Sequence, residues 1–408
     1  MSLRLRTPIV SAALAALIAC GGPDVIDPNQ IDLGIPSLRV EGRGVVNDRY
    51  TGELWIHGNT GYTTTWSTRT FNGVQAIGNA IKIWNVGGAD PVLVDSLLVP
   101  GVATLGDAQV TSDGKYLVVA TEPAGSLLIY GLQNPRAPTL ITRYTSASIA
   151  GGVHTAEVQP VGGRLYAFLS VDPRGGARSK LVILDITTPT AVTEAFVREI
   201  GGPVIHDVFV RDGILMAALW DDGMTIFDIG GGGKGGTPSN PVQLGNVKTV
   251  GGNAHNIYWF HDPRLALKRF AFVGEEGPGS GVGGSTSGDL HVVDVSDMTN
   301  PREVAFLNVP GAGAHNFSAD EENGILYAAF YNGGVRVVDA RGDLSTCAAD
   351  QKSSDGRCDL AKMNRQIAVA LLDVGRPVAI WGVQFTAGRL YASDMLNGLW
   401  RIAPASGP

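Results

Sequence analysis

The sequence predicts an all-β protein: a seven-bladed β-propeller whose four-stranded antiparallel blades form a closed ring. Two observations carry this prediction. The 408 residues include 55 Gly and 22 Pro spread over the whole length, which is typical of many short strands joined by turns rather than of long helices. One strand-turn-strand pattern also recurs seven times after residue 37, at a spacing of about 45 to 65 residues, which suits propeller blades.

Each repeat contains three recognisable strands. The most regular is an apolar strand of the LVILD type, usually followed by a polar turn with Pro. A strand rich in Tyr and Ala precedes it, and a shorter strand precedes that one. Runs of β-branched and aromatic residues suit strands that are buried on both faces between neighbouring blades. The LVILD-type strands begin at Ile81, Leu127, Leu181, Met224, Leu290, Val335 and Leu399.

The last repeat lacks an outer strand, because the strand pattern stops at Ile402. Residues 38–46 precede the first repeat and supply a spare strand of the right length. We expect this N-terminal segment to pair with residues 399–403 and to close the ring, which removes a free sheet edge. A six-bladed or open ring is the alternative.

The segment LVILD that ends at Asp185, with Pro189 four residues later, resembles the LVIVD repeat of exported bacterial propeller proteins. The resemblance covers nearly the whole chain after the first 37 residues. It is weaker where Gly131 and Ala403 replace the Asp. The resemblance implies a propeller domain over residues 38–404 that works outside the cytoplasm.

The start of the chain predicts export and lipidation. Arg4 and Arg6 precede the apolar run IVSAALAALIA, which has the length of a signal-peptide core rather than of a membrane span. The run ends in LIAC, which resembles the bacterial lipobox with Cys20 as the lipid acceptor. We expect a signal peptide over residues 1–19, a lipidated tether over 20–37, and a position at the bacterial outer membrane or cell surface. The lipid would be the only contact with the membrane; an ordinary secretory signal with an incidental Cys is the alternative.

Cys347 and Cys358 then remain as a pair in an oxidising compartment. They flank the polar stretch AADQKSSDGR, so we expect a disulfide across a surface loop. Closing a loop this short contributes about 3 kcal/mol to stability. A metal or redox pair is the alternative, although the spacing is not that of a CxxC motif.

The Asp that ends several LVILD-type strands is expected to be structural. An Asp directly before a turn accepts hydrogen bonds from backbone N–H groups and so stabilises the turn. We therefore assign to turn formation, rather than to catalysis, Asp185, Asp228, Asp294 and Asp339.

Four of the seven histidines fall at one position of the repeat, the start of the innermost strand. They belong to four consecutive blades, so their imidazoles should crowd one end of the central channel. Polar residues are expected beside them, among them Glu53, Asp107 and Asp207. The four histidines are His154, His206, His255 and His315.

The ends of the second strands should lie on the same face of the ring as these histidines. Imidazole and carboxylate groups together suit a divalent metal such as zinc, copper or iron, or a cationic ligand. The alternative is structural, because a Gly-His or Ala-His pair here resembles that of WD-type propellers, where the imidazole ties loops together. The second strands end in Glu122, Asp172, Trp220, Asp221, Asp222, Glu275, Glu276, Tyr331 and Asp394.

These features predict an envelope module that binds an unidentified small ligand or envelope protein through its histidine and carboxylate face, with no certain cofactor. The net charge of -7 argues against nucleic acid as a partner. The first alternative is a metal-dependent enzyme, with copper or zinc, at the same histidines. The second is a scaffold that holds envelope proteins on its blade rims. We interpret the glycine-rich stretch 277–288 as a flexible loop, with a lid over the site as the alternative.

Overall fold

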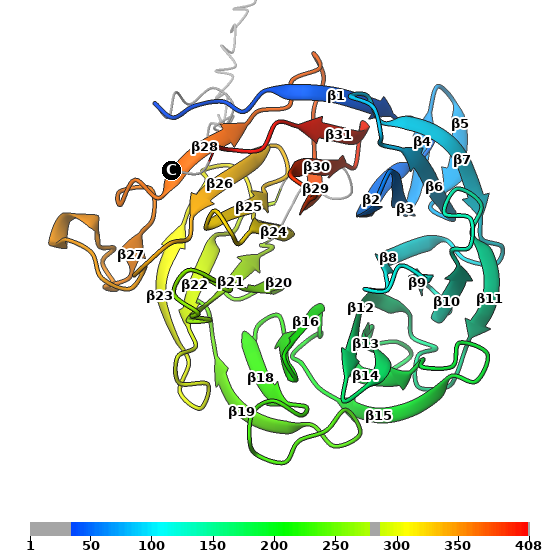
Figure 1. Ribbon diagram of the computed structural model, residues 1–408, viewed down its shortest axis with the longest axis horizontal. Helices are drawn as coiled ribbons and strands as arrows, with labels where there is room; N and C mark the ends of the chain where they lie inside the picture. Colours follow the sequence, from blue (N-terminus) through cyan, green and yellow to red (C-terminus); the bar gives the residue numbers. More distant parts are fainter. Residues whose placement is uncertain (1–33, 278–285, 407–408) are drawn as a thin grey trace, which may run out of the picture.

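The computed structural model describes residues 34–277 and 286–406, and its strands form a ring of seven blades around a central axis (Figure 1). Every blade contains four antiparallel strands, ordered from the channel to the outer rim. In the described ranges the one helical element is a 3-10 turn, η1 (Ala349–Gln351). The predicted all-β, seven-bladed architecture is confirmed.

Blades one to three are each formed by strands that are consecutive along the chain, apart from one inserted hairpin. Blade one comprises β2 (Tyr50–His57), β3 (Thr60–Trp66), β6 (Ala80–Asn85) and β7 (Val92–Leu98). Blade two comprises β8 (Thr104–Val110), β9 (Tyr116–Glu122), β10 (Ser126–Gly131) and β11 (Thr139–Tyr144). Blade three comprises β12 (Val153–Val161), β13 (Arg164–Val171), β14 (Lys180–Asp185) and β15 (Thr193–Glu199).

Blades four to six repeat this arrangement. Blade four comprises β16 (Asp207–Arg211), β17 (Ile214–Ala218), β18 (Met224–Asp228) and β19 (Val242–Val247). Blade five comprises β20 (Ala254–Trp259), β21 (Phe270–Glu275), β22 (Leu290–Asp294) and β23 (Arg302–Leu307). Blade six comprises β24 (Phe317–Asp320), β25 (Ile325–Ala329), β26 (Val335–Asp339) and β28 (Gln366–Ala370).

Blade seven joins the two ends of the described chain (Figure 1). The N-terminal β1 pairs antiparallel with β31, from Val40 opposite Ile402 to Val45 opposite Gly398. The ring is therefore closed by the predicted N-terminal strand, and the six-bladed and open alternatives are excluded. Blade seven comprises β29 (Ile380–Thr386), β30 (Arg389–Asp394), β31 (Gly398–Ile402) and β1 (Val40–Val45).

Two insertions interrupt the repeat of four strands per blade. A hairpin of β4 (Thr68–Phe71) and β5 (Val74–Ile77) leaves blade one after β3. The other insertion follows β26 and adds β27 (Cys358–Asp359), parallel to β23, to the outer edge of blade five. The predicted disulfide between Cys347 and Cys358 lies in this second insertion.

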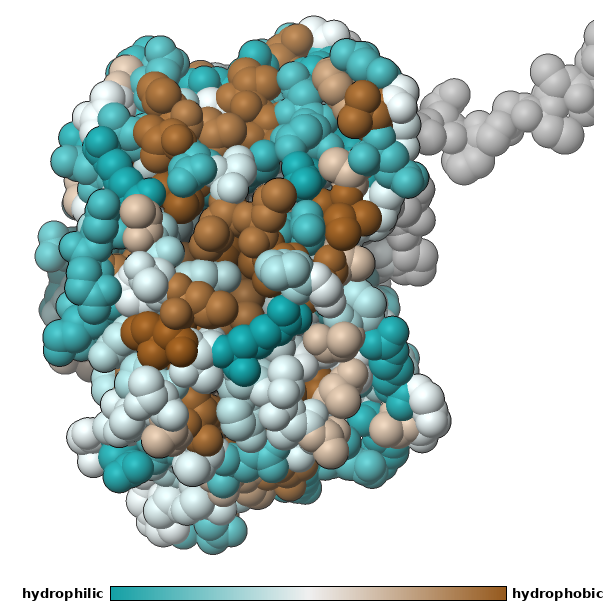
Figure 2. Space-filling model, turned by 90° about the vertical axis from the view of Figure 1, so that its right-hand side faces the viewer, coloured by the Kyte–Doolittle hydropathy of each residue, from teal (hydrophilic) through white to brown (hydrophobic). Residues whose placement is uncertain are grey.

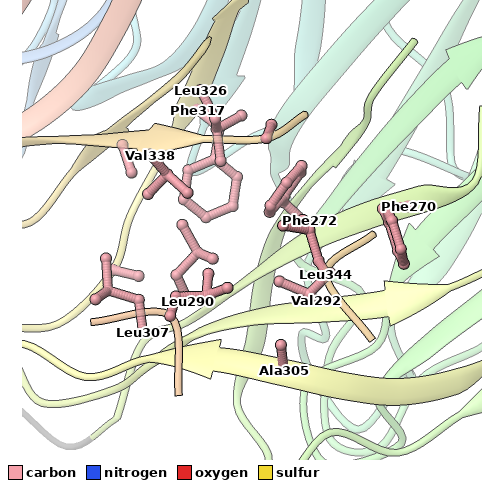
Figure 3. Packing of buried hydrophobic residues seen from close by; sticks show 14 of the residues in the cluster. Phe270, Phe272, Leu290, Val292, Ala305, Leu307, Phe317, Leu326, Val338 and Leu344 are labelled. Carbon is pink, nitrogen blue, oxygen red and sulfur yellow. The ribbon is translucent and has the colours of Figure 1, made fainter. Parts of the chain in front are cut away.

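The core lies between the faces of neighbouring blades, which explains the nearly uniform apolar character of the third strands. Five of the six residues of β14, for example, are buried. Between blades five and six, Phe272, Leu290 and Val292 pack against Phe317 and Leu326 (Figure 3). Leu344, Cys358 and Leu360 of the second insertion join the same cluster, so this insertion is part of the core and not a loose loop.

The motif aspartates stabilise turns, as predicted. Asp185, Asp294 and Asp339 each accept a hydrogen bond from the backbone N–H two residues later, at 3.0, 3.0 and 3.1 Å. Asp228 accepts four backbone N–H bonds from the glycine-rich loop that follows it, at 2.7 to 3.1 Å. These N–H donors lower the pKa of Asp228 to about 2, although burial opposes the shift. Each carboxylate thus has a structural role.

The rim exposes apolar side chains on the outer strand of blade one. Figure 2 views the ring from the side that carries β7 and β11 and shows apolar groups gathered there. The exposed apolar residues of β7 are Val92, Leu93, Val94 and Leu98. In the described part of the chain no helix has the length and hydropathy to cross a membrane. The predicted signal peptide, Cys20, most of the predicted tether and the central part of the glycine-rich stretch 277–288 lie outside the described residues.

Candidate functional site

The predicted histidine position coincides with an interruption of the inner strands. In β12 the register shifts between Val153 and Thr155, and in β20 it shifts between Ala254 and Ile257. Both His154 and His255 therefore lie in bulges, which redirect side chains. As a result, each histidine and the residue that follows it both line the channel cavity, although neighbouring residues of a regular strand point to opposite faces.

The four histidines form a continuous row of rings at one end of the channel. The ring centroids of His154 and His206 are 4.2 Å apart, those of His206 and His255 3.9 Å, and those of His255 and His315 4.0 Å. Two tryptophans complete the circle. Trp381 lies 4.3 Å from His315, and Trp66 lies 5.5 Å from both Trp381 and His154.

Blade two contributes no side chain to this circle. A Cβ atom at Gly106 would lie 2.0 Å from the carbonyl oxygen of His154, so only glycine fits where blades two and three meet. Trp66 spans the resulting gap from the end of β3. Six rings from six blades thus form one layer across the channel.

His154 is the charged member of this layer. Its Nδ1 lies 2.9 Å from Oε1 of Glu122, and its Nε2 lies 2.9 Å from Nε2 of His206. Burial disfavours the protonated imidazole, but the carboxylates of Glu122, Asp172 and Glu276 outweigh burial and raise the pKa of His154 to about 10. Both ring nitrogens of His154 are thus engaged, Nδ1 with Glu122 and Nε2 with His206.

The other three histidines are neutral, and several of their ring nitrogens lack a hydrogen-bond partner. Burial and the neighbouring imidazoles lower the pKa of His206, His255 and His315 well below the ordinary value. Among the described residues, Nδ1 of His206, Nδ1 of His255 and both ring nitrogens of His315 have no partner at hydrogen-bonding geometry. A buried polar atom without a partner costs about 1 to 3 kcal/mol, so four such atoms in one layer point to a ligand.

Two groups of side chains have the spacing of metal ligands. Three potential ligand atoms lie within 4.8 Å of one another, one from each of His206, His255 and Glu276. Glu122, His154 and Asp172 form the second group at the same limit. His315 belongs to neither group among the described residues.

Trp220 and Tyr331 hold their rings over this layer by an uncommon backbone conformation. Their φ angles are 52° and 42°, in the left-handed region that costs non-glycine residues about 1 to 3 kcal/mol. Paired backbone hydrogen bonds to Ala254 and Ile380 of the next blades fix this conformation. Trp220 then stacks on His206 at 5.3 Å, and Tyr331 meets His315 edge-on at 5.1 Å.

A polar layer follows directly below the histidines and ties blades together. Nδ2 of Asn256 donates to Asp207, and Nδ2 of Asn316 donates to Glu53, each at 2.5 Å. Asp107 accepts the backbone N–H of Ala156 in the next blade at 3.0 Å. Burial raises the pKa of Glu53 and of Asp107, and burial together with Asp107 raises the pKa of Asp207 to about 7.

These layers line a cavity of about 660 Å³ that runs along the axis from the histidines to Arg211 and Asp212. Glu157 lines it one level below the polar layer. Burial raises the pKa of Glu157 to about 8. Sequence reasoning did not single out Glu157 or Trp66. The end of β3 in blade one corresponds to the second-strand ends of the other blades. This equivalence is the signal from which Trp66 could have been predicted.

The second-strand ends divide into two sets. Glu122, Asp172, Trp220, Glu276 and Tyr331 lie with the histidines. The remaining positions are engaged elsewhere.

Glu275 binds His291 at 3.2 Å in a separate buried cluster, and Asp394 accepts bonds from Ala379, Leu396, Asn397 and Trp400. Asp222 lies 3.7 Å from Lys248 at the surface. Asp221 is exposed beside Gly252. None of the nine predicted second-strand-end residues, in either set, is among the residues that line the cavity.

The chain is a seven-bladed β-propeller with a circle of four histidines and two tryptophans at one end of its channel. The LVIVD repeat family model matches residues 284–308, a range that includes β22 and β23 of blade five. A search of curated proteins finds no match.

Solved propellers share the fold. Saccharomyces cerevisiae Sqt1 is similar with a TM-score of 0.58 and 11% identity over 91% of this chain and 87% of that one. U3-55K is similar with a TM-score of 0.57 and 12% identity over 90% of this chain and 98% of that one. The Myceliophteria thermophila Cps50 (Swd1) propeller domain is similar with a TM-score of 0.57 and 10% identity over 89% of this chain and 98% of that one. At these identities the similarity shows the fold alone.

Proposed function

We propose that this chain is a binding module of the bacterial envelope, held by a lipid on Cys20, that takes a small cationic ligand into the histidine end of its channel. The propeller supplies a rigid wall, because neighbouring blades share a continuous core. The bulged inner strands supply the ligand-facing side chains.

The carboxyl groups of the cavity wall are the observation that carries this proposal. Four blades contribute five of them: Glu53, Asp107, Glu157, Asp207 and Asp212. Among the described lining residues the one Lys or Arg is Arg211, whose Nη1 lies 2.6 Å from Oε1 of Glu321. Burial raises the pKa of the groups at Glu53, Asp107, Glu157 and Asp207. A cation in the cavity favours their ionised forms and therefore binds with release of protons. Aromatic faces such as those of Trp66 and Trp381 also favour cations.

Calorimetric titration of the full chain tests the proposal with two probes, putrescine in the presence of EDTA and Zn²⁺ in its absence. We expect at least one probe to bind at one equivalent. Glu157→Gln should weaken that binding at least about tenfold, because a hydrogen bond to a charged group contributes about 1.5 to 3 kcal/mol. Glu199→Gln, on the exposed outer strand β15, is the matched control. Absence of binding with both probes, or equal effects of the two variants, rejects the proposal.

A metal-dependent enzyme at the same site is the second candidate function. The grouping of His206, His255 and Glu276 favours it, because two His and one Glu with a fourth position open to water or substrate are a known ligand set of catalytic zinc sites. The adjoining cavity has room for a substrate.

A further inference from the structure

We infer that His206, His255 and Glu276 form a binding site for a divalent transition metal of the zinc or copper class. This inference rests on the proposed function and deepens it, since it identifies the cationic ligand. The three residues come from blades four and five and meet at the histidine layer of the channel.

The spacing of the three side chains fits one ion. Nε2 of His255 and Oε2 of Glu276 are 3.5 Å apart, and one ligand atom of each residue lies within 4.8 Å of the others. Bonds of about 2.0 to 2.1 Å to a single zinc allow at most about 4.2 Å between two ligand atoms. Small side-chain rotations are therefore sufficient to bring all three within reach.

The unsatisfied nitrogens supply an independent reason for a ligand. His255 is 3% exposed, and its Nδ1 has no hydrogen-bond partner among the described residues; the same is true of Nδ1 of His206. Nearly all buried polar groups in proteins have a partner. A metal takes the lone pair of one nitrogen of each ring. His206 offers the lone pair of Nδ1 when the proton between its Nε2 and Nε2 of His154 lies on His206. His255 offers the lone pair of either nitrogen, depending on its tautomer, and Nε2 is the one 3.5 Å from Glu276.

The neighbouring group of Glu122, His154 and Asp172 is a weaker metal site. Both ring nitrogens of His154 are already engaged, with Glu122 and with His206 at 2.9 Å each. Among the described residues His154 therefore has no unused ring nitrogen, whereas His255 retains one at Nδ1.

Side chains outside the three ligands hold them in place. Oη of Tyr331 donates to Oε1 of Glu276, and Trp220 stacks on His206 at 5.3 Å. Such outer contacts orient metal ligands and typically change metal affinity about 10- to 100-fold when removed. Tyr331 is thus a positioning residue for this site.

The test uses the full chain without a polyhistidine tag, stripped with EDTA, and measures Zn²⁺ binding by calorimetry and Co²⁺ binding by visible absorption. We expect one metal per chain. His255→Gln and Glu276→Gln should each weaken zinc binding by about 100-fold or more and change the Co²⁺ bands, because losing a ligand costs more than losing an outer contact. Tyr331→Phe keeps all three ligands and should weaken zinc binding about tenfold. It replaces a ligand variant as the test if that variant does not fold.

His261→Gln is the matched control, because His261 lies outside the histidine layer and its backbone N–H, not its ring, contacts Glu321. Zinc affinity and Co²⁺ spectra of His255→Gln and Glu276→Gln that equal those of the unmodified chain would overturn the inference. If putrescine binding remains sensitive to Glu157→Gln in that case, the proposed function stands and only the metal assignment fails. Loss of both responses rejects both.

Discussion

Glu157 shows how a single residue of the channel couples ligand binding to protonation. Its side chain is half-buried on β12, and among the described residues its carboxyl group accepts one hydrogen bond, from Nε2 of Gln159 at 2.7 Å. Burial raises its pKa to about 8; Gln159 and Arg211 oppose this rise, and the charges of Asp207 and Asp107 add to it. In the folded chain Glu157 is therefore protonated at neutral pH, whereas in the unfolded chain it is ionised.

Glu157→Gln should therefore change the pH dependence of stability. Between about pH 4.5 and 8 the folded chain holds a proton that the unfolded chain has lost, so raising the pH lowers the free energy of unfolding. Gln cannot ionise, and one unit of pKa corresponds to about 1.4 kcal/mol. We expect the variant to gain stability relative to the unmodified chain by a few kcal/mol as the pH rises from 5 to 8.

Urea unfolding at several pH values, without metal or ligand, measures this difference. The same series for Glu199→Gln, on exposed β15, should run parallel to that of the unmodified chain. A constant difference between Glu157→Gln and the unmodified chain over the whole range would contradict the expected protonation state.

The sequence predicted the region of the site but not every residue in it. Recurrence in the repeat placed the four histidines at one end of the channel, and equivalence of strand ends placed Glu122 and Trp220 near them. The choice between Glu275 and Glu276 was not accessible, because successive strand residues face opposite sides and a one-residue shift exchanges them. Glu275 turns to His291, and Glu276 turns to His255.

The insertion after β26 connects two blades at the scale of elements. Its β27 lies parallel to β23 of blade five, and Arg357 binds Glu303 of the same blade. Glu303 in turn lies 2.8 Å from Nδ1 of the fully buried His291. The insertion therefore covers the outer edge of blade five, although its chain belongs to blade six.

Replacing Cys347 and Cys358 by Ser should lower the free energy of unfolding. The disulfide spans a sequence separation of 11, for which loop closure predicts about 3 kcal/mol. Because Cys358 is 1% exposed within the core between blades five and six, the loss should affect the whole ring and not a local loop. Guanidinium unfolding of the variant and of the unmodified chain, with and without reductant, provides the measurement.

Arg357→Ala is the comparison for this prediction, since it removes the contact with Glu303 but keeps the disulfide. The unmodified chain under reducing conditions should match the double Ser variant. Equal midpoints for the double Ser variant and the oxidised unmodified chain would show that the disulfide contributes nothing to stability.

Elements that belong to the repeat were predictable, and elements that interrupt it were not. The seven LVILD-type strands were predicted from the spacing of the repeat. The closing segment was predicted because the last repeat lacks one strand. Among the described residues the hairpin of β4 and β5 has no counterpart in other blades. Arg69 holds it by hydrogen bonds to the carbonyl oxygens of Arg49 and Leu396 at 3.0 Å. Such long-range contacts leave no periodic signal.

At the scale of the whole molecule, β1 joins the first and last blades of the ring. It pairs with β31 in blade seven and also packs tightly against blade one. A Cβ atom at Gly44 would lie 2.3 Å from Cζ3 of Trp84, and one at Gly42 would lie 2.3 Å from the carbonyl oxygen of Ala89. Both glycines are therefore required by the close approach of the first and last blades.

Opening this junction should weaken the whole propeller. A chain that begins at residue 47 lacks β1 and leaves β31 as a free edge, so it should unfold at a lower temperature and associate as its concentration rises. Gly44→Ala tests the same junction in the full chain and should cost about 1 to 3 kcal/mol through overpacking against Trp84. Val45→Ala, at a position that is 43% exposed, should leave stability nearly unchanged. Thermal unfolding and sedimentation of a chain that begins at residue 34 give the reference, and equal melting of the two truncated chains would show that the ring does not depend on its N-terminal strand.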